Sequence, residues 1–199
     1  MKIICIGRNY AAHAAELNNP IPTEPLLFIK PDTAILKDGK PFYHPDFSQD
    51  IHHEIEVVLK ISKSGKSIAP EFAGKYYEQA TLGIDFTARD LQQICKEKGQ
   101  PWEIAKAFDN SAVIGEFISL NELKGEDGNV DFILKMNGKT VQHGNTSQML
   151  NDFDHIISYA SKFFTLQVGD LIFTGTPAGV GQIKIGDVME GFVGERKLL

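Results

Sequence analysis

The sequence predicts an α+β fold in a single domain that spans residues 1–199. The stretch 52–59 has the alternation that is typical of a strand, with Ile55, Val57 and Leu59 on one face and two glutamates on the other, because successive side chains point to opposite faces. Asn137-Gly138, which separates 134–136 from 139–141, is the signal of a type I′ hairpin. Segments with helical character lie between such strands, and a chain of this length can bury a proper core.

The elements follow in order from local signals. Strands are predicted at 3–6, 26–30, 51–62, 80–85, 113–120, 130–136 and 169–174, with a last strand after Asp187. Helices are predicted at 10–17, 70–79, 87–98 and 150–164. The expected N-caps are Asn9, Thr87 and either Asn151 or Asp152, and Gly99 is expected to end the third helix. Asn18-Asn19-Pro20 should stop the first helix, and turns are expected at 37–41 and 63–66.

Composition and charge argue against several classes of protein. Apolar residues make up 42% and charged residues 23% of the chain, and the net charge is −6. A negative chain is poorly suited to bind nucleic acid or anionic membranes. No apolar run approaches the ~20 residues of a membrane helix, and the run at the start ends at Arg8, too early for a secretory leader. Two cysteines indicate no disulfide framework, so the cytoplasm is the simpler location.

Three acidic residues form a candidate metal site. Glu54 and Glu56 share one face of the predicted strand, about 6.6 Å apart along it. Asp85 stands at the end of another predicted strand and could be a third oxygen ligand. Such carboxylates bind Mg²⁺, Mn²⁺ or Ca²⁺. The simpler alternative is two solvated glutamates on a half-exposed strand, with Asp85 as a turn or capping residue.

His13 and Glu16 form a candidate base pair. They are three apart in a short helix and therefore share a face. A carboxylate beside an imidazole orients it, fixes its tautomer and raises its basicity. The alternative is an ordinary surface pair. Because so short a helix is marginal alone, it could be a lid that orders over substrate.

Further polar groups could bind substrate. Lys106 lies among apolar neighbours, which favours a pairing role, although a snorkelling surface lysine is the commoner case. Arg89 and Gln92 are three apart and can face one cleft. The loop 174–181 fits neither the P-loop nor the G-x-G-x-x-G pattern. Its backbone N–H groups could still bind a carboxylate, with help from the hydroxyl of Thr174 or Thr176.

Taken together, these motifs resemble the fumarylacetoacetate hydrolase superfamily, and most closely its small single-domain branch of acylpyruvate hydrolases and oxaloacetate decarboxylases. The matching blocks run in the family's order across nearly the whole chain. They are Gly7-Arg8-Asn9-Tyr10 with His13 and Glu16, His53-Glu54-Ile55-Glu56, residues 83–90, residues 102–108 and residues 174–181.

The resemblance implies a β-rich fold, with mixed sheets rolled around a metal site and a few short helices, and it implies a homodimer. It also implies that Glu54, Glu56 and Asp85 hold Mg²⁺ or Mn²⁺, with Ca²⁺ able to take the site in a crystal. The residues that it marks as catalytic are His13, Glu16 and Lys106. Those that it marks as substrate-binding are Arg8, Arg89, Gln92, Gly175 and Thr176.

The function expected from this resemblance is metal-dependent cleavage of a C–C bond in small 2-oxo acids. Acylpyruvates would be hydrolysed to pyruvate and a carboxylate, with His13 activating the water, and oxaloacetate would be decarboxylated to pyruvate through the same enolate. One alternative is an isomerase, tautomerase or hydratase/dehydratase of the same superfamily that acts on a 2-oxo or sugar acid. The other is a non-catalytic metal-binding protein, which would not need the pair of His13 and Glu16.

Overall fold

The computed structural model describes residues 1–17, 19–37 and 39–199. Asn18 and Asp38 lie outside the described residues, so the predicted helix stop at 18–20 and the predicted turn at 37–41 are described only in part. The strands are β1 (Ile3–Gly7), β2 (Leu26–Lys30), β3 (Ile51–His53), β4 (Ile55–Ile61), β5 (Tyr77–Asp85), β6 (Thr87–Ala88), β7 (Ala112–Ile114), β8 (Ile118–Ser119), β9 (Asp131–Met136), β10 (Lys139–Asn145), β11 (Leu171–Phe173), β12 (Gly181–Gln182), β13 (Met189–Val193) and β14 (Arg196–Lys197). The α-helices are α1 (Ala11–Glu16), α2 (Pro70–Ala73), α3 (Arg89–Lys98), α4 (Glu103–Lys106), α5 (Leu120–Leu123) and α6 (Phe153–Phe163), with 3₁₀ turns at Asp32–Ala34 and Thr146–Gln148.

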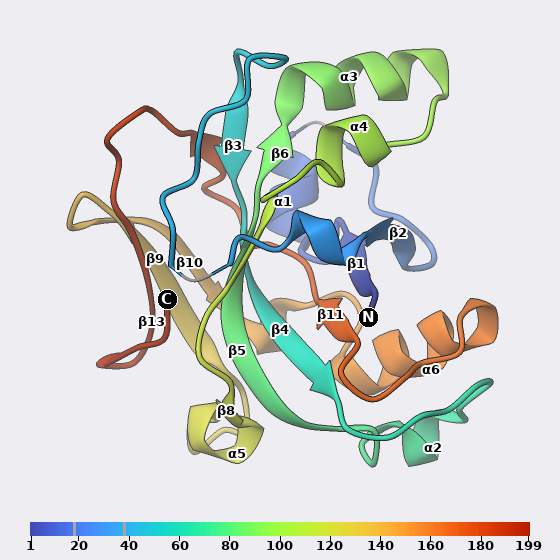
Figure 1. The fold of residues 1–199 in the computed structure, drawn as a ribbon. Helices are drawn as coiled ribbons and strands as arrows, with labels where there is room; N and C mark the ends of the chain where they lie inside the picture. The colour runs from blue at the N-terminus through green and yellow to red at the C-terminus, as the bar shows by residue number, and fades with distance from the viewer. Residues whose placement is uncertain (18, 38) are drawn as a thin grey trace.

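The main sheet has the order β2-β1-β11-β4-β5-β7, and β8 also pairs with β5. β1 and β11 are parallel, whereas the other pairs of this sheet are antiparallel. β4 and β5 curve side by side through the middle of the molecule, with α3 and α4 near one end and α2 and α6 near the other (Figure 1). Ile55, Val57 and Leu59 all lie in the large apolar core, as the alternation predicts.

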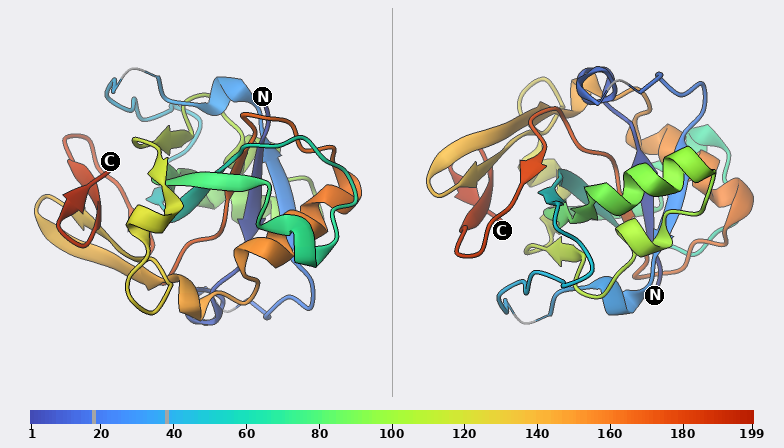
Figure 2. Two further views of the ribbon diagram at one scale, coloured as in Figure 1. Left: turned by 90° about the horizontal axis from the view of Figure 1, so that it is seen from below. Right: turned by 90° about the horizontal axis from the view of Figure 1, so that it is seen from above.

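Two smaller sheets complete the fold. One has the order β10-β9-β13-β14, and its β9–β10 hairpin turns at Asn137 and Gly138, both with positive φ, as the type I′ signal predicts. The other, β12-β3-β6, joins segments that flank the acidic residues. Figure 2 shows the sheets curling around the middle of the molecule. The predicted β-rich α+β fold, with rolled sheets and few short helices, is confirmed.

Several local predictions are wrong because tertiary pairing overrides local signals. The helix predicted at 70–79 ends at Ala73, since Tyr77 already pairs with Ile61 as part of β5. The strand predicted at 113–120 is two short strands, β7 and β8. The strand predicted at 51–62 breaks at Glu54 into β3 and β4.

The predicted caps differ in their outcomes. Asp152 caps α6 by accepting a hydrogen bond from His155 N at 2.8 Å, and Gly99 ends α3 in the left-handed region. The caps predicted at Asn9 and Thr87 are wrong, since no side chain caps α1 or α3. Asn9 instead donates to the carbonyls of Thr174 and Asn151, which ties three segments together.

Within the described residues, no helix is both long and apolar enough to cross a membrane.

Candidate metal centre and active site

The structure brings the three predicted carboxylates together. Glu54 lies between β3 and β4, Glu56 lies on β4, and Asp85 ends β5. The pairing of β4 with β5 sets these positions in register, and one oxygen of each side chain lies within 4.8 Å of the other two. None of the three residues is more than 5% exposed, so they are not the solvated side chains of the simpler alternative.

Two of the carboxylates are paired with cations. Lys106 Nζ donates to Glu54 Oε2 and to Asp85 Oδ2, both at 2.7 Å. Arg89 also donates to Glu54, and Lys30 Nζ lies 2.8 Å from Asp85 Oδ1. Burial alone would raise the pKa of Glu54, but Lys106 and Arg89 outweigh it and hold that pKa well below its usual range.

Glu56 differs, because it has no ion pair within the described ranges 1–17, 19–37 and 39–199. Its Oε2 accepts a hydrogen bond from the backbone N–H of Gly175 at 2.7 Å. Burial raises the pKa of Glu56 well above its usual range, and the charges of Asp85 and Glu54 add to that rise. A divalent cation would stabilise such a buried carboxylate, so the three residues fit Mg²⁺ or Mn²⁺.

Two buried lysines flank this centre. α4 carries Lys106, which the sequence marks, and Thr87 Oγ1 completes its contacts at 2.6 Å. Burial alone would lower the pKa of Lys106, but Asp85 and Glu54 outweigh it and raise that pKa. Lys30 ends β2, is fully buried, and also donates to Ser111 Oγ at 2.9 Å. Sequence reasoning missed Lys30, since a lysine between an apolar strand and a proline carries no local sign of burial.

The pair of His13 and Glu16 exists in the structure and faces the metal centre. His13 Nδ1 lies 3.4 Å from Glu16 Oε2, and His13 lines the same pocket as the carboxylates. Glu16 also accepts from the backbone N–H of Gly179, at 3.0 Å to Oε1, which fixes α1 to the glycine-rich loop. Burial lowers the pKa of His13, although Glu54 and Glu16 oppose the shift, so the imidazole is neutral at neutral pH.

The predicted substrate-binding residues all lie at the centre, but some already have partners. Arg89 Nη1 donates to Gln92 Oε1 at 2.7 Å. Thr176 Oγ1 accepts from Gln142 Nε2 at 2.9 Å and lines the pocket. The N–H of Gly175 goes to Glu56, so in this structure the loop orients a carboxylate of the protein, whereas the prediction was a carboxylate of the substrate.

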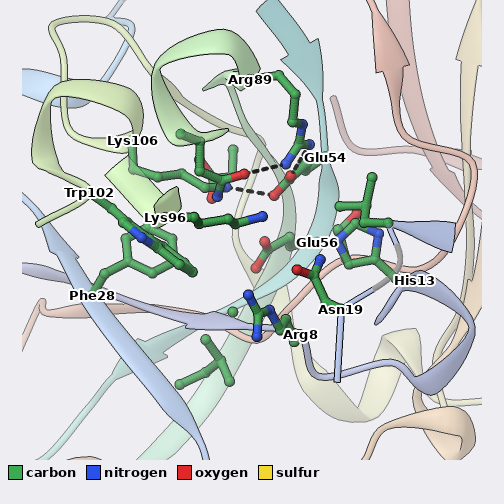
Figure 3. A pocket seen from close by; sticks show the side chains of 16 residues that line it. Arg8, His13, Asn19, Phe28, Glu54, Glu56, Arg89, Lys96, Trp102 and Lys106 are labelled. Atoms are coloured by element: carbon green, nitrogen blue, oxygen red, sulfur yellow. Dashed lines mark hydrogen bonds and ion pairs between the residues drawn. The ribbon is translucent and has the colours of Figure 1, made fainter. Parts of the chain in front are cut away.

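The pocket over the carboxylates has two unlike ends. In Figure 3, His13 lies on one side of Glu56, and Trp102 and Phe28 lie on the other. Arg8, Lys96 and Asn19 surround the space between them (Figure 3). The sequence analysis predicted Arg8 as a substrate-binding residue. It predicted no role for Lys96, Asn19, Trp102 or Phe28. Trp102 is the one tryptophan in the sequence and begins the block 102–108 that resembles the family, so the sequence did carry a signal for it.

Comparison with known proteins agrees with this geometry. The model of the fumarylacetoacetate (FAA) hydrolase C-terminal family matches residues 2–195. This chain belongs to the fumarylacetoacetate hydrolase family. It is 44% identical over 190 residues to the mitochondrial oxaloacetate decarboxylase of Dictyostelium discoideum, covering 95% of this chain and 87% of that protein. It is 42% identical to the mitochondrial oxaloacetate tautomerase FAHD1 of Mus musculus, covering 94% and 85%.

Solved structures of the fumarylacetoacetate hydrolase family have the same fold. The crystal structure of fumarylpyruvate hydrolase from Pseudomonas aeruginosa, in complex with Mn²⁺ and pyruvate, matches with a TM-score of 0.91 at 37% identity. The match covers 100% of this chain and 87% of that one. The family and the fold that the sequence resemblance implies are therefore confirmed.

Proposed function

We propose that this chain is a divalent-metal-dependent enzyme that cleaves a C–C bond in small 2-oxo acids, by decarboxylating oxaloacetate or hydrolysing acylpyruvates. One observation carries the proposal: the buried cluster of Glu54, Glu56 and Asp85 shares a pocket with His13. The names of the relatives add support, since they refer to oxaloacetate and to fumarylpyruvate.

Glu54, Glu56 and Asp85 would hold Mg²⁺ or Mn²⁺. The bound ion would supply a Lewis acid for the oxygens of a 2-oxo acid. The uncompensated charge of Glu56 supports a cation at this position. Lys106 and Arg89 orient Glu54, and Gly175 orients Glu56, so the donor set is positioned by the surrounding chain.

His13 would act as the general base of the hydrolysis. With Nδ1–H donating to Glu16, Nε2 is the nitrogen that can accept a proton. A water would lose its proton to Nε2 while its oxygen attacks the distal carbonyl carbon. The C–C bond then breaks, giving a carboxylate and the enolate of pyruvate, which takes up a proton. Decarboxylation needs no water, because loss of CO₂ leaves the same enolate.

Tautomerisation of oxaloacetate is the second candidate. The relative from Mus musculus is named a tautomerase, as is YcgM of Escherichia coli, which is 41% identical over 186 residues. This reaction needs a base to move one proton between carbon and oxygen with no bond cleavage, and His13 is placed to do so.

The test is product formation by the protein treated with EDTA, and then with Mg²⁺ or Mn²⁺ added. Pyruvate would be measured from acetylpyruvate and from oxaloacetate, and loss of the enol absorbance of oxaloacetate would report tautomerisation. Metal-dependent pyruvate formation would support the first proposal, and enol loss without pyruvate would favour the second. No turnover in protein that binds metal would contradict both and favour a non-catalytic metal-binding protein.

Three accompanying predictions belong to the same proposal. Residues 1–199 would act as one catalytic domain, which the family match over 2–195 supports. The chain would form a homodimer, which size-exclusion chromatography with light scattering would test. A cytoplasmic location stays a prediction, and two of the relatives are named as mitochondrial proteins.

A further inference from the structure

The end of the pocket opposite His13 carries two cations around one aromatic ring. Arg8 follows β1, and its guanidinium carbon lies 6.0 Å from the centroid of the Trp102 ring. Lys96 lies on α3, and its Nζ lies 5.8 Å from the same centroid. Both side chains line the pocket together with the metal-binding carboxylates. In Figure 3 their charged ends point toward the space beside Glu56. We call Arg8, Lys96 and Trp102 the cationic end of the pocket.

The charges of the cationic end are free to bind a ligand. In the part of the chain that the structure describes, neither Arg8 nor Lys96 forms an ion pair, and both are only partly exposed. The other two cations that line the pocket are already engaged, Arg89 with Glu54 and Gln92 and Lys106 with Glu54 and Asp85. Partial burial of a charge without a partner is unfavourable, and burial lowers the pKa of Lys96 to about 8.

The backbone of Arg8 supports a binding role. Its φ is +60°, in the left-handed region that residues other than glycine seldom adopt. Such strain persists where the surrounding structure holds a residue in place, and it gathers at ligand-binding sites. Here it carries the guanidinium over Trp102 and into the pocket.

We propose that Lys96 and Arg8 bind a second carboxylate of the substrate, so that the enzyme prefers 2-oxo dicarboxylates to 2-oxo acids with an uncharged distal end. This inference rests on the proposed function, because it assumes that the 2-oxo acid end of the substrate lies at Glu54, Glu56 and Asp85. The carboxylate next to the oxo group then has its own partners there. The two unpaired cations are left for a group farther along the substrate.

Trp102 and Phe28 complete this end with an apolar wall, their ring centroids 6.1 Å apart. The wall limits the water that reaches the cations, which strengthens an ion pair formed there. Charge-assisted hydrogen bonds to a carboxylate would therefore discriminate against substrates that lack one.

The test compares Lys96→Met with the wild-type enzyme on oxaloacetate, a dianion, and on acetylpyruvate, whose distal end is uncharged. The expected result is a rise in KM for oxaloacetate of about 10- to 100-fold, in line with a hydrogen bond to a charged group. The kcat for oxaloacetate should not fall, because the distal carboxylate loses its charge as CO₂ leaves. For acetylpyruvate the change should stay within about twofold. Lys98→Met is the matched control, since Lys98 is exposed on the same helix and does not line the pocket.

The contradicting outcomes are distinct. Equal rises in KM for both substrates would mean that Lys96 contacts the carboxylate that they share, and unchanged kinetics would mean that it contacts neither. If the wild-type protein turns over neither substrate, the proposed function fails. Binding of oxaloacetate and of pyruvate to the Mg²⁺-loaded protein is then measured directly, with fresh oxaloacetate in titrations that are short compared with its spontaneous decarboxylation. A Lys96→Met variant that weakens the binding of both equally, or of neither, overturns the inference.

Variation of pH gives an independent measurement. Lys96 is charged below its pKa of about 8, in surroundings that include Arg8, Arg89, Lys106 and Glu54. The ratio of KM for oxaloacetate to that for acetylpyruvate should therefore rise as pH rises through about 8. In Lys96→Arg the ratio should stay flat over this range, because a guanidinium remains charged. A flat ratio in the wild-type enzyme would contradict the assignment.

Discussion

The floor and the proposed lid of the candidate active site are built in opposite ways. The floor, formed by Glu54, Glu56 and Asp85, lies at the paired ends of β4 and β5 and is almost fully buried. The lid, helix α1 with His13 and Glu16, has six residues and no side-chain cap. Its outer carboxylate, Glu16, is 32% exposed and is held by the backbone N–H of one glycine, Gly179.

The difference shows how binding and proton transfer can be separated in one pocket. A metal site needs fixed donors, and paired strands supply them. A base that must admit substrate and water benefits from a segment that opens at low cost in free energy. Changes in the floor should therefore remove every reaction, whereas changes in the lid should remove some reactions more than others.

The largest effect is expected for Glu56→Gln, which tests the floor. Activity should fall about 1,000-fold or more for every substrate, since Lewis-acid catalysis is worth several kcal/mol and about 1.4 kcal/mol is tenfold in rate. Calorimetric titration should show weakened binding of Mn²⁺. In EDTA the variant should melt no lower than the wild-type protein, because burial raises the pKa of Glu56 and this carboxyl therefore weakens the metal-free fold at neutral pH. A lower Tm in EDTA, with metal binding intact, would contradict this account of Glu56.

His13→Ala tests the lid and should have the next largest effect. Hydrolysis of acetylpyruvate should fall about 10²- to 10⁴-fold, the usual contribution of a general base. Decarboxylation of oxaloacetate should fall much less, because it needs no activated water. His155→Ala is a matched control, since His155 lies on α6 and does not line the pocket. Equal losses in both reactions would show that the floor and the lid do not divide the chemistry in this way.

Gly175→Ala tests the contact between the loop and the floor. Gly175 has φ +103°, and an added Cβ would lie 2.6 Å from Asn9 Cβ. Strain and overpacking should together cost about 2–4 kcal/mol of unfolding free energy, measured by urea titration. Gly186→Ala is the control, because its φ is +94° but nothing lies within 4 Å of the added Cβ. It should cost about 1–2 kcal/mol. Similar losses in the two variants would mean that Asn9 moves aside easily.

The smallest effect is expected in the pH profile of Glu16→Gln. Only neutral His13 is a base, so kcat/KM for acetylpyruvate should fall as the solution becomes more acid than the pKa of His13. Burial already lowers this pKa, and the hydrogen bond that His13 donates to Glu16 opposes the shift. Loss of the charged partner should therefore lower the pKa further and move the acid limb of the profile to lower pH. A shift to higher pH would contradict the pairing.

The parts of the site that the sequence predicts are those that depend on short-range patterns. Glu54 and Glu56 lie on one face because a strand alternates, and His13 meets Glu16 because a helix repeats. Lys30 and Lys96 escape prediction because their burial depends on segments far along the chain. Lys30 contacts Ser111, and Lys96 lies over the same Trp102 ring as Arg8.

The same reasoning explains the errors in the fold. Tyr77 follows a helical pattern locally, but its pairing with Ile61 makes it a strand residue. Asn9 has the chemistry of a helix cap, but its amide is used to join Thr174 and Asn151. In both cases a long-range partner competes with the local preference and wins.

The three-residue strand β11 has a consequence for synthesis of the protein. It lies between β1 and β4, so it joins the N-terminal strands, which lead into the lid, to the strands that carry the floor. Leu171 pairs with Ile3, and the contact of Glu16 with Gly179 comes later still. During translation the two halves of the catalytic pocket must therefore wait for the last part of the chain. Until then the edges of β1 and β4 that pair with β11 stay unpaired. Unpaired strand edges promote aggregation, so the nascent chain should depend on chaperones.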